Sequence, residues 1–187
     1  MGSVKLSILI PSLFSRADSL NSLVGELNKQ MDSLNLRPYV QILTNIDGGQ
    51  MSIGEKRNKL MSDAKGEYVC FIDDDDEISK DYLKLIFEKI MPDCCSLTGI
   101  IDFDGTNPKP FHHTVVNTSY FENEQGYQRP PNHLNVIRRE IASNYLFTPK
   151  NHGEDTDWSM EICNAGVLRN EARIHPILYH YKFKTKK

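Results

Sequence analysis

The sequence predicts an α/β domain with a mostly parallel sheet flanked by helices and with a less regular second half. Strand-like and helix-like patterns alternate between residues 5 and 90, an order typical of parallel strands joined by helices. The apolar run YVCFI at residues 68–72 passes directly into five consecutive acids, as expected where a strand of such a sheet ends at a ligand site. Because strand–helix–strand crossovers are right-handed, we expect helices on both faces of the sheet.

Three strands and three helices are expected in the first half of the chain. The strands are short apolar runs, and the helices follow from apolar residues at helical spacing or from a polar run between turn residues. We place the strands at residues 5–11, 39–45 and 68–72 and the helices at residues 20–34, 54–64 and 83–90. Ser15 or Asp18 suits the N-cap of the first helix, and Ser79 suits that of the third.

The second half of the chain is expected to be less regular. Residues 104–131, where Gly and Pro recur, indicate loops and short hairpin strands. The other expected elements are a strand at residues 95–103, helices at 138–144 and 154–164, and a final strand at 174–183. Gly166 suits the C-cap of the last helix, and Pro176 interrupts the final strand.

Length and composition fit a single globular domain of 187 residues. The formal net charge of −3 argues against binding to nucleic acid through charge alone. No apolar run approaches the ~18 residues of a membrane span, and the N-terminus lacks the pattern of a secretory signal. The four cysteines form no Cys-x-x-Cys motif, which favours a reducing compartment, so we expect a cytoplasmic protein. The sequence leaves its oligomeric state open.

The acidic run DDDDE at residues 73–77 is the strongest chemical signal. Adjacent carboxylates repel one another, and no basic residue nearby in the sequence neutralises them. A hard divalent cation such as Mg²⁺ or Mn²⁺ would do so, because it prefers oxygen ligands and binds through one or two carboxylates together with substrate phosphates. The alternative is a solvated acidic turn that precedes the next helix.

Four segments, in their order along the chain, resemble the family 2 glycosyltransferases with the GT-A fold. They are SILIPSLFSR at residues 7–16, Asp47 after the second strand, GEKRNKLMSDAKGEYVCFIDDDDEIS at residues 54–79, which holds an Asp-x-Asp motif, and HGEDTDW at residues 152–158. The resemblance implies a metal-dependent, inverting transferase that moves a sugar from a nucleotide sugar, in particular a UDP-sugar, to an acceptor hydroxyl. It divides the domain into a nucleotide-sugar half at residues 1–103 and an acceptor half at residues 104–187.

The resemblance also assigns residues to the donor. Those at the nucleotide sugar would be Pro11, Ser12, Arg16, Asp47, Lys56, Arg57, Asp73 and Asp74. Among them, Asp47 would accept a hydrogen bond from the base, and Asp73 would lie near the ribose. Lys56 and Arg57 lie on the helix that would face the nucleotide, although either equally suits a solvated helix surface.

The metal ion, Mn²⁺ or Mg²⁺, would be bound by the Asp-x-Asp motif. The resemblance assigns Asp75 and Asp73 as its ligands, with Asp76 in an assisting role. His180, in LYHYKF, lies roughly where related enzymes offer a third ligand. A lone histidine on a strand is also commonly a structural residue, so both interpretations stay open.

The catalytic pair implied by the resemblance is Glu154–Asp155, in which Asp155 would deprotonate the acceptor hydroxyl. A transferase needs a carboxylate near the acceptor, separate from the acids near the diphosphate. Glu154 and Asp157 also suit the start of a helix, where its dipole favours acids. Trp158 has two interpretations, stacking on a sugar or burial in the core. The sequence assigns no role to His133.

Two other functions remain as alternatives. A sugar nucleotidyltransferase has a similar fold, but it should carry a Gly-rich phosphate loop after the first strand, where this chain has PSLFSR. A non-catalytic module that binds a nucleotide sugar or a cation would show the same acidic run without turnover.

Overall fold

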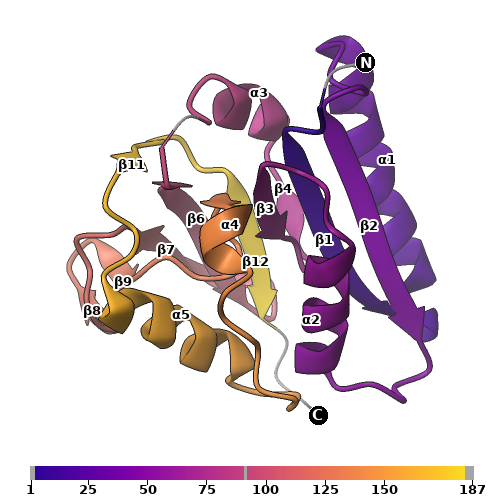
Figure 1. Ribbon diagram of the computed structural model, residues 1–187. Coiled ribbons are helices and arrows are strands. Elements are labelled where there is room, and N and C mark those ends of the chain that lie inside the picture. The colour runs from indigo at the N-terminus through magenta and orange to yellow at the C-terminus, as the bar shows by residue number, and fades with distance from the viewer. Residues whose placement is uncertain (1–2, 91, 184–187) are drawn as a thin grey trace.

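The computed structural model describes residues 3–90 and 92–183, which form two six-stranded sheets flanked by helices (Figure 1). The strands of the first sheet are, in order across it, β11 (Glu171–Ala172), β5 (Cys94–Cys95), β10 (Ile137–Arg138), β3 (Tyr68–Phe71), β1 (Leu6–Leu13) and β2 (Val40–Asp47). β1 pairs in parallel with β2 and with β3, as the alternation of strands and helices predicts. β10 runs antiparallel to β3 and β5.

Helices cover both faces of the first sheet. Leu6, Ile8 and Ile10 of β1 pack in one apolar cluster with α1 (Ala17–Ser33) and α3 (Tyr82–Phe87). Leu9, whose side chain points to the other face, packs in a second cluster with α2 (Ile53–Asp63). The helices expected from the sequence are therefore confirmed, although α3 ends earlier than expected.

Neither N-cap prediction from the sequence holds. α1 follows the short 3-10 turn Phe14–Arg16, and no side chain caps it, so the N-cap prediction of Ser15 or Asp18 is wrong. The prediction of Ser79 is wrong too, because the N-cap of α3 is Asp81 and no side chain caps that helix. α2 begins with a capping box instead: the Ser52 hydroxyl accepts from the Glu55 N–H over 3.3 Å, and the Glu55 carboxylate accepts from the Ser52 N–H over 2.8 Å. This reciprocal bonding fixes the start of the helix that carries Lys56 and Arg57.

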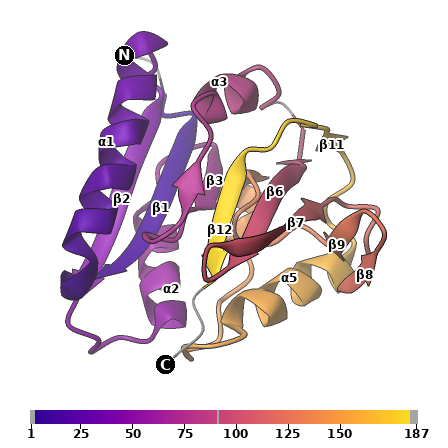
Figure 2. The same ribbon diagram turned by 180° about the vertical axis from the view of Figure 1, so that it is seen from behind.

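The second sheet is formed mainly by the less regular half of the chain. Its strands are, in order, β4 (Glu77–Ile78), β12 (Tyr179–Phe183), β6 (Leu97–Phe103), β7 (Thr106–His113), β9 (Gly126–Arg129) and β8 (Phe121–Asn123). Figure 2 shows β12, β6 and β7 side by side. The short strands expected within residues 104–131 thus form a sheet, and the final strand is shorter than the predicted 174–183.

Prolines in β7 are accommodated because only part of this strand is paired on both sides. Pro108 and Pro110 lie where β7 pairs with β6 alone, whereas Phe111–His113 also pair with β9. Gly126 begins β9 at a φ of +106°, and a Cβ there would lie 2.1 Å from the Pro110 carbonyl oxygen. Only glycine permits this approach.

Two helices complete the fold, α4 (Arg139–Ala142) and α5 (Glu154–Ala165). Gly166 ends α5 in the left-handed region at a φ of 62°, which confirms the C-cap prediction. Trp158 of α5 is a core residue, because it is 2% exposed and stacks on Phe147 with ring centroids 4.8 Å apart. Within the described residues, no helix is both long and apolar enough to span a membrane.

His113 of β7 is a buried imidazole at the centre of the second half. Its Nδ1 lies 3.1 Å from Asn135 Oδ1, while Nε2 is buried without a hydrogen-bond partner among the described residues. Burial, together with the charge of Arg129, lowers the pKa of His113 to about 3. The native protein therefore holds this imidazole neutral.

We expect His113→Asn to weaken the pH dependence of stability between pH 7 and pH 5. The unfolded chain protonates this histidine near its ordinary pKa of about 6.5, whereas the native state does not, so stability falls as pH drops through this range. Thermal melts at several pH values check the slope. The exposed His175→Asn removes an imidazole from the surface and serves as the control. An unchanged slope in His113→Asn would contradict the assignment.

Candidate active site

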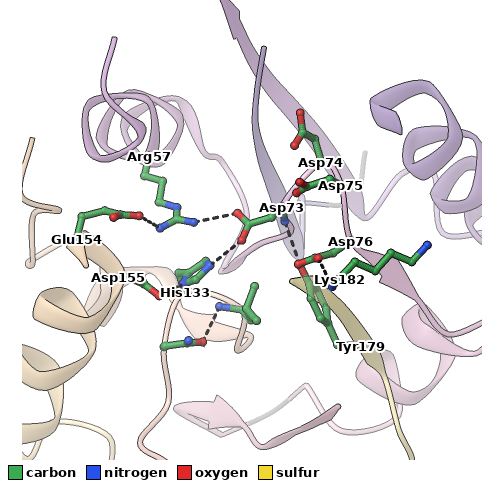
Figure 3. A network of polar contacts seen from close by, with 12 residues as sticks. Arg57, Asp73, Asp74, Asp75, Asp76, His133, Glu154, Asp155, Tyr179 and Lys182 are labelled. Carbon is green, nitrogen blue, oxygen red and sulfur yellow. Dashed lines mark hydrogen bonds and ion pairs between the residues drawn. The ribbon is translucent and has the colours of Figure 1, made fainter. Parts of the chain in front are cut away.

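The acidic run lies where the two sheets meet, between β3 and β4. Tyr179 on β12 fixes the turn, because its hydroxyl donates to Asp76 Oδ2 over 2.8 Å and accepts from the Asp73 N–H over 3.1 Å (Figure 3). The Lys182 N–H donates to the other Asp76 oxygen over 2.9 Å. Burial and the charge of Asp73 raise the pKa of Asp76 to about 8. Asp76 thus anchors the acidic turn to the second sheet.

The next two acids face the end of β1. Asp74 is 2% exposed and accepts from the Ser12 hydroxyl over 2.5 Å and from Arg16 over 2.8 Å. Arg16 also lies 3.1 Å from Asp75, whose side chain is 24% exposed. The interpretation as a solvated acidic turn is wrong for Asp74 and Asp76, which are buried. The neutralising charges come from residues distant in sequence.

Asp75 carries its charge beside two other carboxylates. Burial and the neighbouring carboxylates of Asp74 and Asp73 raise its pKa, despite the nearby charge of Arg16. Residues 3–90 and 92–183 contain no group of three or more His, Cys, Asp or Glu side chains arranged to hold a metal ion. Asp73 and Asp75, which are each partly exposed, offer carboxylate oxygens of the kind that a hard cation prefers.

Arg57 joins the acidic run to α5. Its guanidinium is 2% exposed, donates to Asp73 Oδ1 over 2.9 Å and forms a second ion pair with Glu154 (Figure 3). The cation also lies over the rings of Phe71 and Phe147, at 5.8 and 5.6 Å from their centroids. Arg57 and the nearby His133 hold the pKa of Asp73 well below its usual range even though partial burial of this carboxyl opposes the shift. The sequence left open whether Arg57 lies on a solvated helix surface. The structure shows that it is buried instead.

His133 lies between the two acidic groups. Its Nε2 is 3.5 Å from Asp73 Oδ2 and its Nδ1 is 3.7 Å from Asp155 Oδ2, and the side chain is 5% exposed. The backbone fixes this position, because the His133 carbonyl accepts from the Phe71 N–H of β3 over 2.8 Å. The sequence analysis did not identify the position of His133 between the two acidic groups. The signal that could have indicated it is the turn-forming segment PPNHLNV. Its Asn132 side chain stabilises a tight turn around His133 by accepting a hydrogen bond from the Leu134 N–H.

Lys56 and Asp47 form a second buried connection, at the end of β2. Lys56 is 4% exposed, donates to the Ser12 carbonyl over 2.5 Å and pairs with Asp47. The Asp47 carboxylate also accepts from the N–H groups of Gly49 and Met51, each over 2.8 Å. Lys56 and these N–H groups lower the pKa of Asp47 to about 2. Lys56 is therefore buried too, and Asp47 holds its own turn in place.

Two adjoining clefts flank this network. The first, of about 370 Å³, is lined by Pro11, Ser12, Leu13, Arg16, Gly49, Met51, Ile53, Lys56, Asn151 and His152. The second, of about 500 Å³, is lined by Arg57, Asp73, His133, Glu154 and Asp155 on its polar side. Ile53, Asn151 and His152 border both clefts, so the two are continuous. Six of the donor residues assigned from the sequence line these two clefts, together with Glu154 and Asp155. Asp74 and the predicted metal ligand Asp75 line a third cleft of about 530 Å³ instead, and Asp47 lines none of the three.

The first turn of α5 carries three acids in different settings. Glu154 is 4% exposed because of its ion pair with Arg57. The Asp155 side chain is 29% exposed and lines the second cleft. Asp157 is exposed and pairs with Lys150 over 2.5 Å. All three acids lie at the N-terminus of α5, so their different exposures come from their different tertiary contacts.

His180 lies apart from this arrangement. Its Nε2 is 2.5 Å from Asp102 Oδ2, and its Nδ1 is 3.7 Å from Glu77. On β12 its side chain alternates with Tyr179, which contacts the acidic turn, and Tyr181, which lines the second cleft. The structure therefore does not bring His180 to Asp73 and Asp75.

Comparison with solved structures identifies the fold. A structure of Staphylococcus aureus TarS, residues 1–349, superposes with a TM-score of 0.61 at 14% identity, covering 96% of this chain and 60% of that one. The same TarS fragment in complex with UDP-GlcNAc gives a TM-score of 0.58 at 13% identity, covering 98% and 60%. The catalytic domain of Drosophila β1,4-galactosyltransferase 7, in complex with xylobiose, gives 0.56 at 12% identity, covering 91% and 65%.

These neighbours share the GT-A fold, which confirms the fold expected from the sequence. The chain spans about 60% of the TarS fragment that it matches. No curated protein sequence matches it. The profile of glycosyl transferase family 2 matches residues 47–152, a stretch that includes Asp47, the acidic run and His133 and ends two residues before Glu154. The match covers more than half of the chain, and the chain belongs to glycosyl transferase family 2.

Proposed function

We propose that this domain transfers a sugar from a UDP-sugar to an acceptor hydroxyl, with inversion at the anomeric carbon and with Mn²⁺ or Mg²⁺ as its cofactor. The observation that carries the proposal is the pair of acidic groups on either side of His133, with Asp73 and Asp155 each within 3.7 Å of its ring. Separate carboxylates for a departing diphosphate and for an attacking hydroxyl are what this reaction requires.

The first cleft is the proposed site of the nucleotide. It is lined by four of the donor residues inferred from the sequence, Pro11, Ser12, Arg16 and Lys56, and the last two bring positive charge for phosphates. The TarS structures with UDP-GlcNAc and with UDP support a uridine nucleotide. Asp47 Oδ2 accepts a hydrogen bond from the Met51 N–H and keeps a lone pair for the N–H of uracil. We accordingly assign residues 1–103 mainly to the donor and residues 104–187 mainly to the acceptor.

The cation would be bound by Asp75 and Asp73 without His180. The raised pKa of Asp75 supports this assignment, since a cation supplies the positive charge that the side chain lacks. When bound, such a cation neutralises the diphosphate and polarises it as a leaving group. Arg16 lies at the same acids and is the protein's own cation nearest to that charge.

Catalysis by the chain itself centres on Asp155. Its carboxylate takes the proton of the acceptor hydroxyl, the oxygen attacks the anomeric carbon, and the bond to the diphosphate oxygen breaks with its electron pair on the leaving group. One direct displacement inverts the anomeric centre and needs a base but no protein nucleophile. His133 and the Arg57–Glu154 ion pair hold the two acids in register, so Glu154 acts as a positioning residue.

We also propose that the protein is cytoplasmic. The four cysteines are free, and the three at Cys70, Cys94 and Cys95 are buried. Burial raises the pKa of each of these three thiols to about 12 or above, so they stay protonated and unreactive. A fold that uses buried thiols as apolar side chains suits the reducing cytoplasm.

We expect UDP binding to depend on the divalent cation. Two phosphates placed beside Asp73 and Asp75 without a cation would bring like charges together. Calorimetric titration of UDP in Mn²⁺ should show an affinity at least about tenfold higher than in chelator, a difference of ~1.4 kcal/mol. Asp75→Asn should reduce this difference, whereas Asp63→Asn, a change at an exposed acid of α2, should not. Equal affinities with and without Mn²⁺ would remove the cation from the proposal.

We expect Asp155→Asn to reduce turnover by roughly 10² to 10⁴ while UDP affinity stays near wild type, because the amide keeps the size of the side chain and cannot accept the proton. Release of UDP from a panel of UDP-sugars and acceptors measures turnover. Asp157→Asn, two residues along the same helix turn, is the matched control and should keep its activity. Full activity in Asp155→Asn would show that Asp155 is not the base. UDP binding without turnover in the wild type would favour the non-catalytic module.

A further inference from the structure

Arg129 is a cation in the second cleft that the proposed reaction does not use. It ends β9, and its carbonyl accepts from the N–H of Thr114 and from the side chain of Asn117, each over 3.1 Å. Its guanidinium lies over the rings of Tyr120 and Tyr127, at 5.5 and 5.6 Å from their centroids. The backbone is thus fixed, and aromatic rings orient the planar cation.

The two arginines that line this cleft differ in their partners. Arg57 forms ion pairs with Asp73 and Glu154, so its charge is used within the protein. Arg129 forms no ion pair with any carboxylate in the part of the chain that the structure describes. A half-buried guanidinium over aromatic rings retains all its hydrogen-bond donors for a ligand, and its fork suits the paired oxygens of a phosphate or carboxylate.

The wall around Arg129 is largely aromatic. Five rings line the cleft on this side, from Phe103, Phe111, Tyr127, Tyr181 and Phe183. Aromatic faces suit the apolar faces of a sugar ring. The charge of Arg129 does reach the catalytic side of the cleft, because burial and the charges of Asp76, Asp73 and Asp155 raise the pKa of Tyr181 to about 12 while Arg129 opposes this shift. The charges of both the proposed base and Arg129 therefore act on Tyr181.

On the basis of the proposed function, we infer that the acceptor is a sugar that bears an oxyanion, and that Arg129 binds this oxyanion while Asp155 faces the hydroxyl. The charges in the cleft agree with this orientation. Arg57 compensates Asp73 and Glu154, whereas in the described residues no Lys or Arg pairs with Asp155 and no carboxylate pairs with Arg129, and both of these side chains line the cleft. An anionic group is repelled by Asp155 and attracted by Arg129, so it directs the neutral end of the sugar to the base.

The inference is tested by NMR titration of the ¹⁵N-labelled protein, saturated with UDP and the diamagnetic Mg²⁺, with glucose, glucose 6-phosphate and glucuronic acid. We expect at least one anionic sugar to bind about tenfold or more tightly than glucose, the gain typical of a hydrogen bond to a charged group. The two anionic sugars distinguish a phosphate from a carboxylate. Inorganic phosphate alone should bind more weakly than glucose 6-phosphate, because it cannot contact the aromatic wall.

Arg129→Gln should bring the three sugar affinities within about twofold of one another, and Arg129→Lys should keep part of the preference, because the charge remains without the planar fork. Lys109→Gln is the matched control, since Lys109 also lies over Tyr127, at 4.9 Å, but is paired with Glu122 and does not line the cleft. The spectrum of each variant shows whether it is folded.

Equal affinities for all three sugars in the wild type, or a preference that survives Arg129→Gln, would overturn the inference. UDP binding in the same samples reports on the proposed function separately. Loss of UDP binding with the anionic preference intact would contradict the transferase proposal alone, whereas UDP binding with equal sugar affinities would overturn only the assignment of the acceptor.

Discussion

The buried ion pairs of Arg57 are the constraint on which the rest of the site depends. A guanidinium that is 2% exposed is stable only if carboxylates compensate its charge, and Asp73 and Glu154 supply them from the two halves of the sequence. Such a pair adds little net stability compared with an apolar core, but removing one partner is costly because the other stays buried and unpaired. The donor acids and the helix of the proposed base are therefore positioned together.

α2 serves both clefts through two consecutive residues. Lys56 reaches the end of β1 and Asp47, while Arg57 reaches Asp73 and Glu154. The N-cap box fixes the start of the helix, and a Cβ at Gly54 would lie 2.0 Å from the Thr148 carbonyl oxygen, so α2 lies directly against the loop that leads to α5. This close approach places the loop that leads to α5 beside the first cleft.

The sequence was sufficient to predict the parallel strands, their helices and the acids at the end of β3, because these follow from local periodicity and from motifs. It could not predict what lies opposite those acids. Arg16, His133 and Tyr179 reach the acidic turn from distant segments, and only the folded chain brings them there. The second sheet was predicted only as scattered short strands, because pairing around Pro110 and Gly126 depends on long-range register. Arg129 gave no local signal at all.

The most direct test of this account is a double-mutant cycle between Arg57 and Glu154, measured by urea denaturation with Arg57→Met, Glu154→Met and the double variant. Arg57→Met should lose about 3–5 kcal/mol of stability, since it leaves the buried Glu154 without its partner, and Glu154→Met should lose less, since Arg57 keeps its ion pair with Asp73. The double variant should lose at least ~1 kcal/mol less than the sum of the two, because the variants share one interaction. Losses that add within ~0.5 kcal/mol would show that the two side chains act independently and would contradict the account.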